Sequence, residues 1–103
     1  MSTEFPDVLF SSKKEDWGTP EDVFNTLDEE FDFILDAAAA KHNAKCHFYY
    51  DITDDSLSKP WHPFQRVFLN PPYSRSIGDW VAKARQEADK GATVVLLIPA
   101  RTD

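Results

Sequence analysis

The chain has 103 residues, of which 42% are hydrophobic and 14% aromatic, a composition typical of one packed domain that argues against a disordered chain. Eleven basic and 18 acidic residues give a formal net charge of −7, which excludes a protein whose whole surface neutralises nucleic-acid phosphates. Any contact with nucleic acid would need a local basic face. The sequence offers Arg75, Lys83, Arg85 and Arg101 for it, all in the last third of the chain.

The single cysteine, Cys46, excludes an internal disulfide and a zinc site built from several cysteines. There is no signal peptide and no apolar run of membrane-spanning length, so we expect a cytoplasmic protein that makes no membrane contact. The three histidines, at positions 42, 47 and 62, share no ligand spacing. The sequence therefore predicts no metal site.

Residues 1–15 carry no clear periodicity, and we interpret them as a loosely ordered lead-in with one short strand at 8–10. Residues 16–103 are predicted to form the domain. Its first strong pattern is at 17–22, where Thr19 suits a helix N-cap and Pro20 suits the first helical position. Apolar residues at helical spacing follow as far as Phe31, which predicts a helix.

Four apolar segments are predicted to be strands: 31–36, 47–51, 66–69 and 93–98. The four alanines at 37–40 are predicted to begin a helix after the first strand. A third helix is predicted between Ser76, as its N-cap, and Gly91, with an apolar stripe of Ile77, Trp80, Val81, Ala84 and Ala88. Strands that alternate with helices indicate an α/β domain with a mainly parallel sheet.

Polar residues stand where three of these strands end: Asp36, Asp51 and Asn70. In open parallel sheets, ligands bind beyond the carboxyl ends of the strands, so these side chains are predicted to converge on one crevice. Taken singly, each acid is also typical of a loop residue or a helix cap that contacts no ligand. Trp61, beside two prolines, is more typical of a lid on the core than of a ligand contact, and Trp80 is predicted to be core.

Asn70 opens the tetrapeptide Asn-Pro-Pro-Tyr at residues 70–73, which follows an apolar strand and precedes an amphipathic helix. An amine on an aromatic base is a poor nucleophile, because its lone pair is delocalised into the ring. The Asn70 side-chain oxygen and the carbonyl of Pro71 can both accept hydrogen bonds from such an amine and localise that pair. The prolines stiffen the loop, and Tyr73 can stack on a base flipped out of a duplex.

The segments that contain these residues resemble phage and prophage DNA N6-adenine methyltransferases of the Dam-like type, and the resemblance extends over residues 16–103. It is carried by residues 16–20 (Asp-Trp-Gly-Thr-Pro), 35–39 (Leu-Asp-Ala-Ala-Ala), 43–46, 67–75, 80–84 and 94–103. It implies a Rossmann-like methyltransferase fold that uses S-adenosylmethionine to methylate adenine in double-stranded DNA. A protein of this kind is expected in the cytoplasm of a bacterial host.

The resemblance also implies site residues. Residues 70–73 match the catalytic tetrapeptide of the family, and Asp36 with Ala37 matches its cofactor-binding turn. Trp17, Thr19 and Pro20 match the segment near the methionine end of the cofactor. Asp51 is the first choice for the ribose-binding acid, whereas Asp55 is the acid expected to face the adenine ring of the cofactor.

Family members continue with further strands after the segment that corresponds to residues 99–103. We therefore expect this chain to lack the C-terminal strands of the full fold and to present strand 93–98 as an apolar edge, covered by a second copy or another chain. An alternative is a catalytically inactive core or an acidic interaction protein that pairs through this edge. Within the enzyme class, methylation of cytosine N4 or of a protein amide also fits the tetrapeptide.

Overall fold

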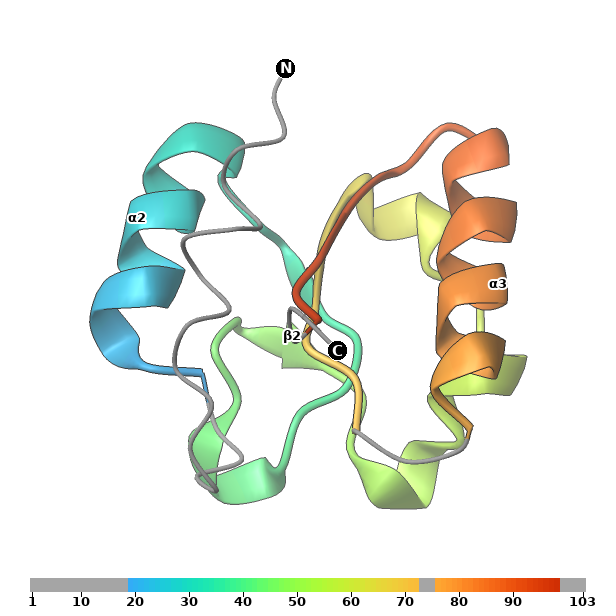
Figure 1. The fold of residues 1–103 in the computed structure, drawn as a ribbon, viewed down its shortest axis with the longest axis horizontal. Helices are drawn as coiled ribbons and strands as arrows, with labels where there is room; N and C mark the ends of the chain where they lie inside the picture. Colours follow the sequence, from blue (N-terminus) through green and yellow to red (C-terminus); the bar gives the residue numbers. More distant parts are fainter. Residues whose placement is uncertain (1–18, 73–75, 99–103) are drawn as a thin grey trace, which may run out of the picture.

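The computed structural model of the chain describes residues 19–72 and 76–98 (Figure 1). Four parallel strands form one sheet in the order β2-β1-β3-β4. They are β1 (Leu35–Asp36), β2 (Phe48–Tyr49), β3 (Arg66–Leu69) and β4 (Thr93–Leu96). The predicted α/β class with a parallel sheet is confirmed, and the arrangement is consistent with a Rossmann-like methyltransferase core. The predicted lead-in at 1–15 and its strand at 8–10 lie outside the described residues.

The central strand β3 sets the register of the sheet, with Val67 opposite Leu35 on one side and Leu69 opposite Leu96 on the other. Successive residues of β3 point to opposite faces, as the pleat of a strand requires. Val67 and Leu69 therefore pack into one hydrophobic cluster, whereas Phe68 packs into another. Because both faces of β3 are covered, its three apolar residues are all buried, which explains why its sequence is a continuous apolar run.

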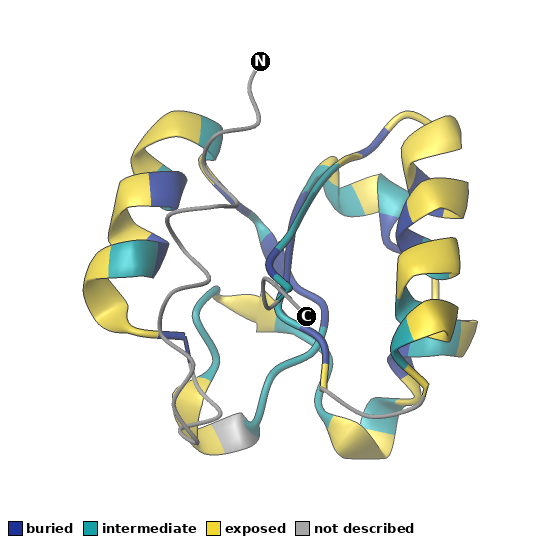
Figure 2. Ribbon diagram, in the orientation of Figure 1, coloured by how far each residue is buried: buried dark blue, intermediate teal, exposed yellow. Residues whose placement is uncertain are grey.

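One helix covers each face of the sheet, α2 (Glu21–Phe31) on one side and α3 (Ile77–Asp89) on the other (Figure 1). Phe24 and Leu27 of α2 are buried with Phe68. Ala84 of α3 is buried on the opposite face with Val67 and Leu69. The buried residues thus gather along the strands and on the helix faces that meet them (Figure 2).

The helix predicted after Pro20 is confirmed, but the capping role predicted for Thr19 is wrong. Pro20 occupies the N-cap position, and no side chain caps this end of α2. The helix ends at Phe31, and the C-cap residue Asp32 has a left-handed backbone (φ 57°) that reverses the chain. Asp28 stabilises this end, because its carboxylate accepts a hydrogen bond from the backbone N–H of Phe33 at 2.8 Å. The reversal leads the chain directly into β1.

The helix predicted between Ser76 and Gly91 is also confirmed, but its buried face differs from the predicted stripe. Glu87 is fully buried, whereas Val81 is 41% exposed. Ser76 is the N-cap residue but makes no side-chain cap hydrogen bond, and Gly91 ends the segment with a φ of 114°. The face of α3 that meets the sheet is therefore rotated away from the stripe predicted from apolar residues alone.

Trp61 packs on this side of the sheet as the predicted lid on the core, with none of its surface exposed. Trp80 of α3 is half-buried and stacks on it, with ring centroids 6.2 Å apart. The indole N–H of Trp61 donates to the carbonyl and hydroxyl oxygens of Ser56, both at 3.1 Å. These bonds satisfy the polar atom of an otherwise apolar, buried side chain.

Short 3-10 turns make up much of the remaining chain: η1 (Lys41–Asn43), η2 (Ile52–Asp54), η3 (Ser56–Ser58) and η4 (His62–Phe64). The helix predicted to start in the alanines at 37–40 is wrong, since only a turn and η1 follow β1. Among the described residues, no helix is long and apolar enough to cross a membrane.

Candidate functional site

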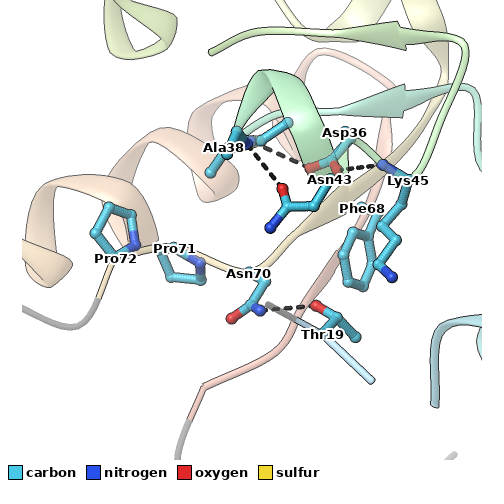
Figure 3. A pocket seen from close by; sticks show the side chains of 11 residues that line it. Thr19, Asp36, Ala38, Asn43, Lys45, Phe68, Asn70, Pro71 and Pro72 are labelled. Carbon is cyan, nitrogen blue, oxygen red and sulfur yellow. Dashed lines mark hydrogen bonds between the residues drawn. The ribbon is translucent and has the colours of Figure 1, made fainter. Parts of the chain in front are cut away.

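A cavity of about 400 Å³ lies beyond the carboxyl ends of β1 and β3 (Figure 3). This is the edge of a parallel sheet at which ligands bind. Its lining combines small residues with polar side chains from three separate parts of the chain, at 19, 36–45 and 68–72. The lining residues are Thr19, Asp36, Ala38, Ala39, Ala40, Asn43, Lys45, Phe68, Asn70, Pro71 and Pro72.

Asp36 ends β1 and forms part of the cavity wall, although only 3% of its surface is exposed. Its carboxylate accepts the backbone N–H of Lys45 at 2.9 Å and that of Ala38 at 3.4 Å. Burial raises the pKa of Asp36 above its ordinary value, while the two N–H groups and the charge of Lys45 act in the opposite direction. Asp36 thus holds the segment from Ala38 to Lys45 over the end of the strand.

Asn70 follows the last residue of β3 and lies across the cavity from this segment. Its side-chain nitrogen donates a hydrogen bond to the hydroxyl oxygen of Thr19 at 2.7 Å (Figure 3). Pro71 is buried, whereas Pro72 is exposed, and both line the cavity. The predicted meeting of Asp36 and Asn70 at one crevice is therefore present in the structure.

The second acid of the predicted crevice, Asp51, lies after β2 and is not among the residues that line the cavity. Its carboxylate caps η2 and accepts from the backbone N–H and the hydroxyl of Thr53, at 3.0 and 2.6 Å. Asp55 does not line the cavity either. It is exposed, and its carboxylate accepts the hydroxyl of Ser58 at 2.9 Å. The roles of Asp51 and Asp55 toward a cofactor stay predictions.

The other predicted cofactor residues are distributed around the cavity. Thr19 lines it, and Pro20 is exposed at the start of α2. Ala37 is fully buried in the core between Asp36 and the lining residue Ala38. Trp17 and the catalytic candidate Tyr73 lie outside the described residues.

Sequence reasoning assigned no role to several lining residues, among them Asn43 and Lys45. The Asn43 side chain accepts the backbone N–H of Ala40 at 3.1 Å and so closes η1 beside the cavity. Lys45 is largely buried, and its Nζ lies 3.4 Å from Glu21 of α2. Neither residue belongs to a spacing pattern in the sequence. They reach the site because the backbone N–H of Lys45 donates a hydrogen bond to the Asp36 carboxylate. The one available signal was the resemblance at 43–46.

The basic face expected after the tetrapeptide is only partly described. Lys83 is 12% exposed and binds the buried Glu87 at 3.1 Å, so its charge is already neutralised. Arg85 is exposed on α3, with Asp89 at 4.0 Å. Arg75 and Arg101 lie outside the described residues. In the described ranges, no group of three or more His, Cys, Asp or Glu side chains could hold a metal ion.

Cys46, for which the sequence favours a small buried residue over a reactive thiol, is half-buried in the structure. Burial raises the pKa of its thiol to about 12, and the negative charges of Asp36 and Asp28 act in the same direction. Since a thiolate is the nucleophilic form of cysteine, a raised pKa disfavours the reactive form of this thiol at neutral pH. Cys46 is not among the residues that line the cavity, whose polar side chains carry only oxygen and nitrogen groups.

The family model for DNA N-6-adenine-methyltransferase (Dam) matches residues 8–103. A DNA N-6-adenine-methyltransferase of Escherichia phage T1 is 32% identical over 99 residues, which is 95% of this chain and 40% of that protein. One of Haemophilus phage HP1 is 30% identical over 89 residues, 84% of this chain and 51% of that protein. The chain thus spans about half the length of these curated relatives or less. No solved structure matches it. With nearly all of its length matched by the family model, the chain belongs to the DNA N-6-adenine-methyltransferase (Dam) family.

Proposed function

We propose that this chain carries the site that transfers a methyl group from S-adenosylmethionine to the N6 amine of adenine in DNA. The observation that carries the proposal is the position of Asn70, Pro71 and Pro72. They follow β3 directly and share one cavity with Asp36 and with the segment folded over the end of β1. Membership of the family supports the same reaction and a DNA substrate.

The cavity suits a small-molecule cofactor. Its volume of about 400 Å³ falls within the range of small-molecule sites, roughly 300–1,000 Å³. Thr19, Asp36 and Asn43 supply polar atoms around it, and Ala38 to Ala40 leave space because their side chains are small. S-adenosylmethionine, when bound, supplies an electrophilic methyl group on a positively charged sulfur. We propose that these residues hold it.

The tetrapeptide would act on the target amine. The Asn70 side-chain oxygen and the Pro71 carbonyl accept hydrogen bonds from the amine and stabilise the positive charge that develops on it. Pro71 and Pro72 fix the backbone dihedral φ and so keep these acceptors in place. Tyr73, outside the described residues, is proposed to stack on the flipped adenine.

Transfer of a labelled methyl group from S-adenosylmethionine to unmethylated duplex DNA tests the proposal directly. Digestion of the product to nucleosides should give N6-methyladenine as the labelled species. Label in N4-methylcytosine, or in protein, would show that the target is another planar amine and not the N6 amine of adenine. If calorimetry finds that neither S-adenosylmethionine nor its demethylated product binds, the cofactor assignment is wrong.

Replacing Asp36 by Asn is expected to weaken cofactor binding by roughly 5- to 150-fold. The change replaces one acceptor oxygen by an NH₂ group that faces the backbone N–H of Lys45 or Ala38, and an unmet buried donor costs about 1–3 kcal/mol. The segment that lines the cavity would lose its attachment to β1. Calorimetry with the demethylated cofactor measures the effect. Asp89→Asn, at an exposed position on α3, is the matched control, and an equal loss in both variants would contradict the prediction.

The sheet edge at β4 is the proposed site of a protein contact. β4 pairs with β3 and stands last in the strand order, and its residues Val94 to Leu96 are half-buried. A second copy or another chain that adds a strand here would cover this edge. Light scattering over a range of concentrations tests for the second copy. A monomer at all concentrations would exclude the second copy as the occupant.

A further inference from the structure

The hydrogen bond between Asn70 and Thr19 joins the end of β3 to the residue that precedes α2. The two residues are 51 positions apart, and their side-chain atoms Nδ2 and Oγ1 are 2.7 Å apart. Thr19 is 7% exposed, so water competes little for this bond. Both side chains line the cavity, and the bond lies at its wall (Figure 3).

In the structure this bond holds the Asn70 amide in one orientation, in which the nitrogen donates and the Thr19 hydroxyl accepts, although a hydroxyl can also donate to an amide oxygen. The last torsion of an asparagine side chain is broad and roughly two-fold, so the backbone alone does not decide which end of the amide faces a ligand. An amide has a donor end and an acceptor end, and only the oxygen can accept a hydrogen bond from an amine. When the nitrogen donates to Thr19, the oxygen points away from Thr19, as Figure 3 shows.

The position of Thr19 is itself fixed. The carbonyl of the next residue, Pro20, accepts the N–H of Phe24 at 3.0 Å in the first turn of α2. Phe24 in turn packs edge-on against Phe68 of β3, with ring centroids 5.1 Å apart. The backbone next to Thr19 is thus held, through Phe24, against β3, the strand that Asn70 follows. A group held in this way can orient a side chain without itself touching the reacting atoms.

We infer that Thr19 is a positioning residue for Asn70, whose amide it orients so that the oxygen is presented to the target amine. The inference rests on the proposed function for its consequence in catalysis. The hydrogen bond itself does not depend on that function and can be tested separately. It gives Thr19 a role distinct from the cofactor contact that the family resemblance implies.

Thr19→Val removes the hydroxyl and keeps the shape of the side chain, whereas Thr19→Ser keeps the hydroxyl. In methyl transfer, Thr19→Val is expected to lower kcat about fivefold, the factor that one neutral hydrogen bond is worth, with a smaller change in KM for the cofactor. Thr19→Ser should restore most of kcat. Thr26→Val is the matched control, because the Thr26 hydroxyl is exposed on α2 and bonds only within that helix. A change in KM alone, with kcat unaltered, would overturn the inference.

A second measurement does not depend on activity. In the nitrogen-15 NMR spectrum, the side-chain NH₂ signals of Asn70 can be assigned by their loss in Asn70→Asp. One of the two protons should be shifted downfield with a weak temperature dependence in the unmodified chain. Thr19→Val should abolish this shift, whereas Thr19→Ser and Thr26→Val should retain it.

The two measurements separate the inference from the proposed function. If the unmodified chain transfers no methyl group to DNA but the Asn70 signal responds to Thr19→Val as expected, the proposed function fails and the orienting bond stands. If the two NH₂ protons of Asn70 behave alike in the unmodified chain, the inference is wrong even where Thr19→Val does not fold. An active chain whose kcat is unaffected by a folded Thr19→Val variant also overturns it.

Discussion

Asn70→Ala is expected to lower kcat for methyl transfer to adenine by at least about 100-fold, because groups aimed at developing charge in an active site typically contribute this much. The variant removes the acceptor oxygen and leaves the Thr19 hydroxyl without its amide donor. The fold should persist, since Asn70 lies after β3 and is only half-buried. Incorporation of labelled methyl groups under saturating cofactor and DNA gives the rate.

Two variants separate the acceptor from other properties of the side chain. Asn70→Asp retains acceptor oxygens at the same place and should keep far more activity than Asn70→Ala. Asn25→Ala, at an exposed position on α2, is the matched control for the loss of an amide and should leave the rate unchanged. Thr19→Val added to Asn70→Ala should have little further effect on kcat, since Thr19 acts through Asn70. A rate for Asn70→Ala within a few fold of the unmodified chain would remove Asn70 from the mechanism.

The strands and helices that could be predicted are those with long, regular patterns. The apolar run at 66–69 is β3, and helical spacing after Pro20 gives α2. Strand ends were less predictable: 31–36 and 47–51 were expected to be strands, yet β1 and β2 have two residues each. The backbone around them still bonds in sheet-like fashion, as between Ala39 and Tyr50 at 2.9 Å. The apolar pattern therefore locates these strands but extends further than the regular pairing.

The missing helix after β1 shows a tertiary contact that overrides local preference. Alanine is the best helix former, so four in a row predicted a helix. In the structure, the N–H of Ala38 donates to the Asp36 carboxylate and that of Ala39 to the carbonyl of Tyr50. Backbone groups bonded in this way to a strand end and to a neighbouring strand are held outside a helical path. The small side chains instead leave room for the cavity.

The candidate site was predictable where it depends on strand ends and unpredictable where it depends on loops. Asp36 and Asn70 meet because β1 and β3 are adjacent and parallel. Asp51 was predicted to end a strand too, but it lies two residues after β2, which is at the sheet edge, and its carboxylate caps η2. Whether a polar residue at a strand end faces a ligand or caps the next turn depends on short-range hydrogen bonds that the spacing of residues does not reveal.

Glu87 was absent from the predicted core because a charged residue is seldom fully buried unless it is paired. Its carboxylate is completely enclosed between α3 and the chain around Trp61. Oε1 lies 2.8 Å from each of three nitrogens, the backbone N–H groups of Trp61 and His62 and Nδ1 of the His62 ring. Oε2 accepts from Lys83 at 3.1 Å and Lys90 at 3.4 Å. An ionised carboxylate only accepts, so Nδ1 of His62 carries a proton.

Glu87→Gln is expected to lower the free energy of unfolding at pH 7 by roughly 3 kcal/mol, the usual scale for breaking a buried ion pair. Glutamine retains the size of the side chain but replaces one oxygen by an NH₂ group. Whichever way the amide turns, this group faces either the ammonium groups of Lys83 and Lys90 or the N–H groups at 61–62. Urea unfolding followed by tryptophan fluorescence measures the loss. Glu30→Gln, exposed on α2, is the matched control and should stay within about 0.5 kcal/mol of the unmodified chain.

The effect of Glu87 should also depend on pH in a defined direction. Burial alone would raise the pKa of Glu87, but hydrogen bonds from the His62 ring, the N–H groups of Trp61 and His62, and Lys83 reverse this and hold the pKa far below its ordinary value. A carboxyl whose pKa is lower in the folded than in the unfolded chain stabilises the fold fully above the unfolded pKa, about 4.3 for glutamate, and loses that contribution as the pH falls toward the folded pKa. The gap between the unmodified chain and Glu87→Gln should therefore be constant from pH 7 to about 5 and narrow below pH 4. A gap that widens on acidification would show that the ionised carboxylate does not stabilise the contact between α3 and residues 61–62.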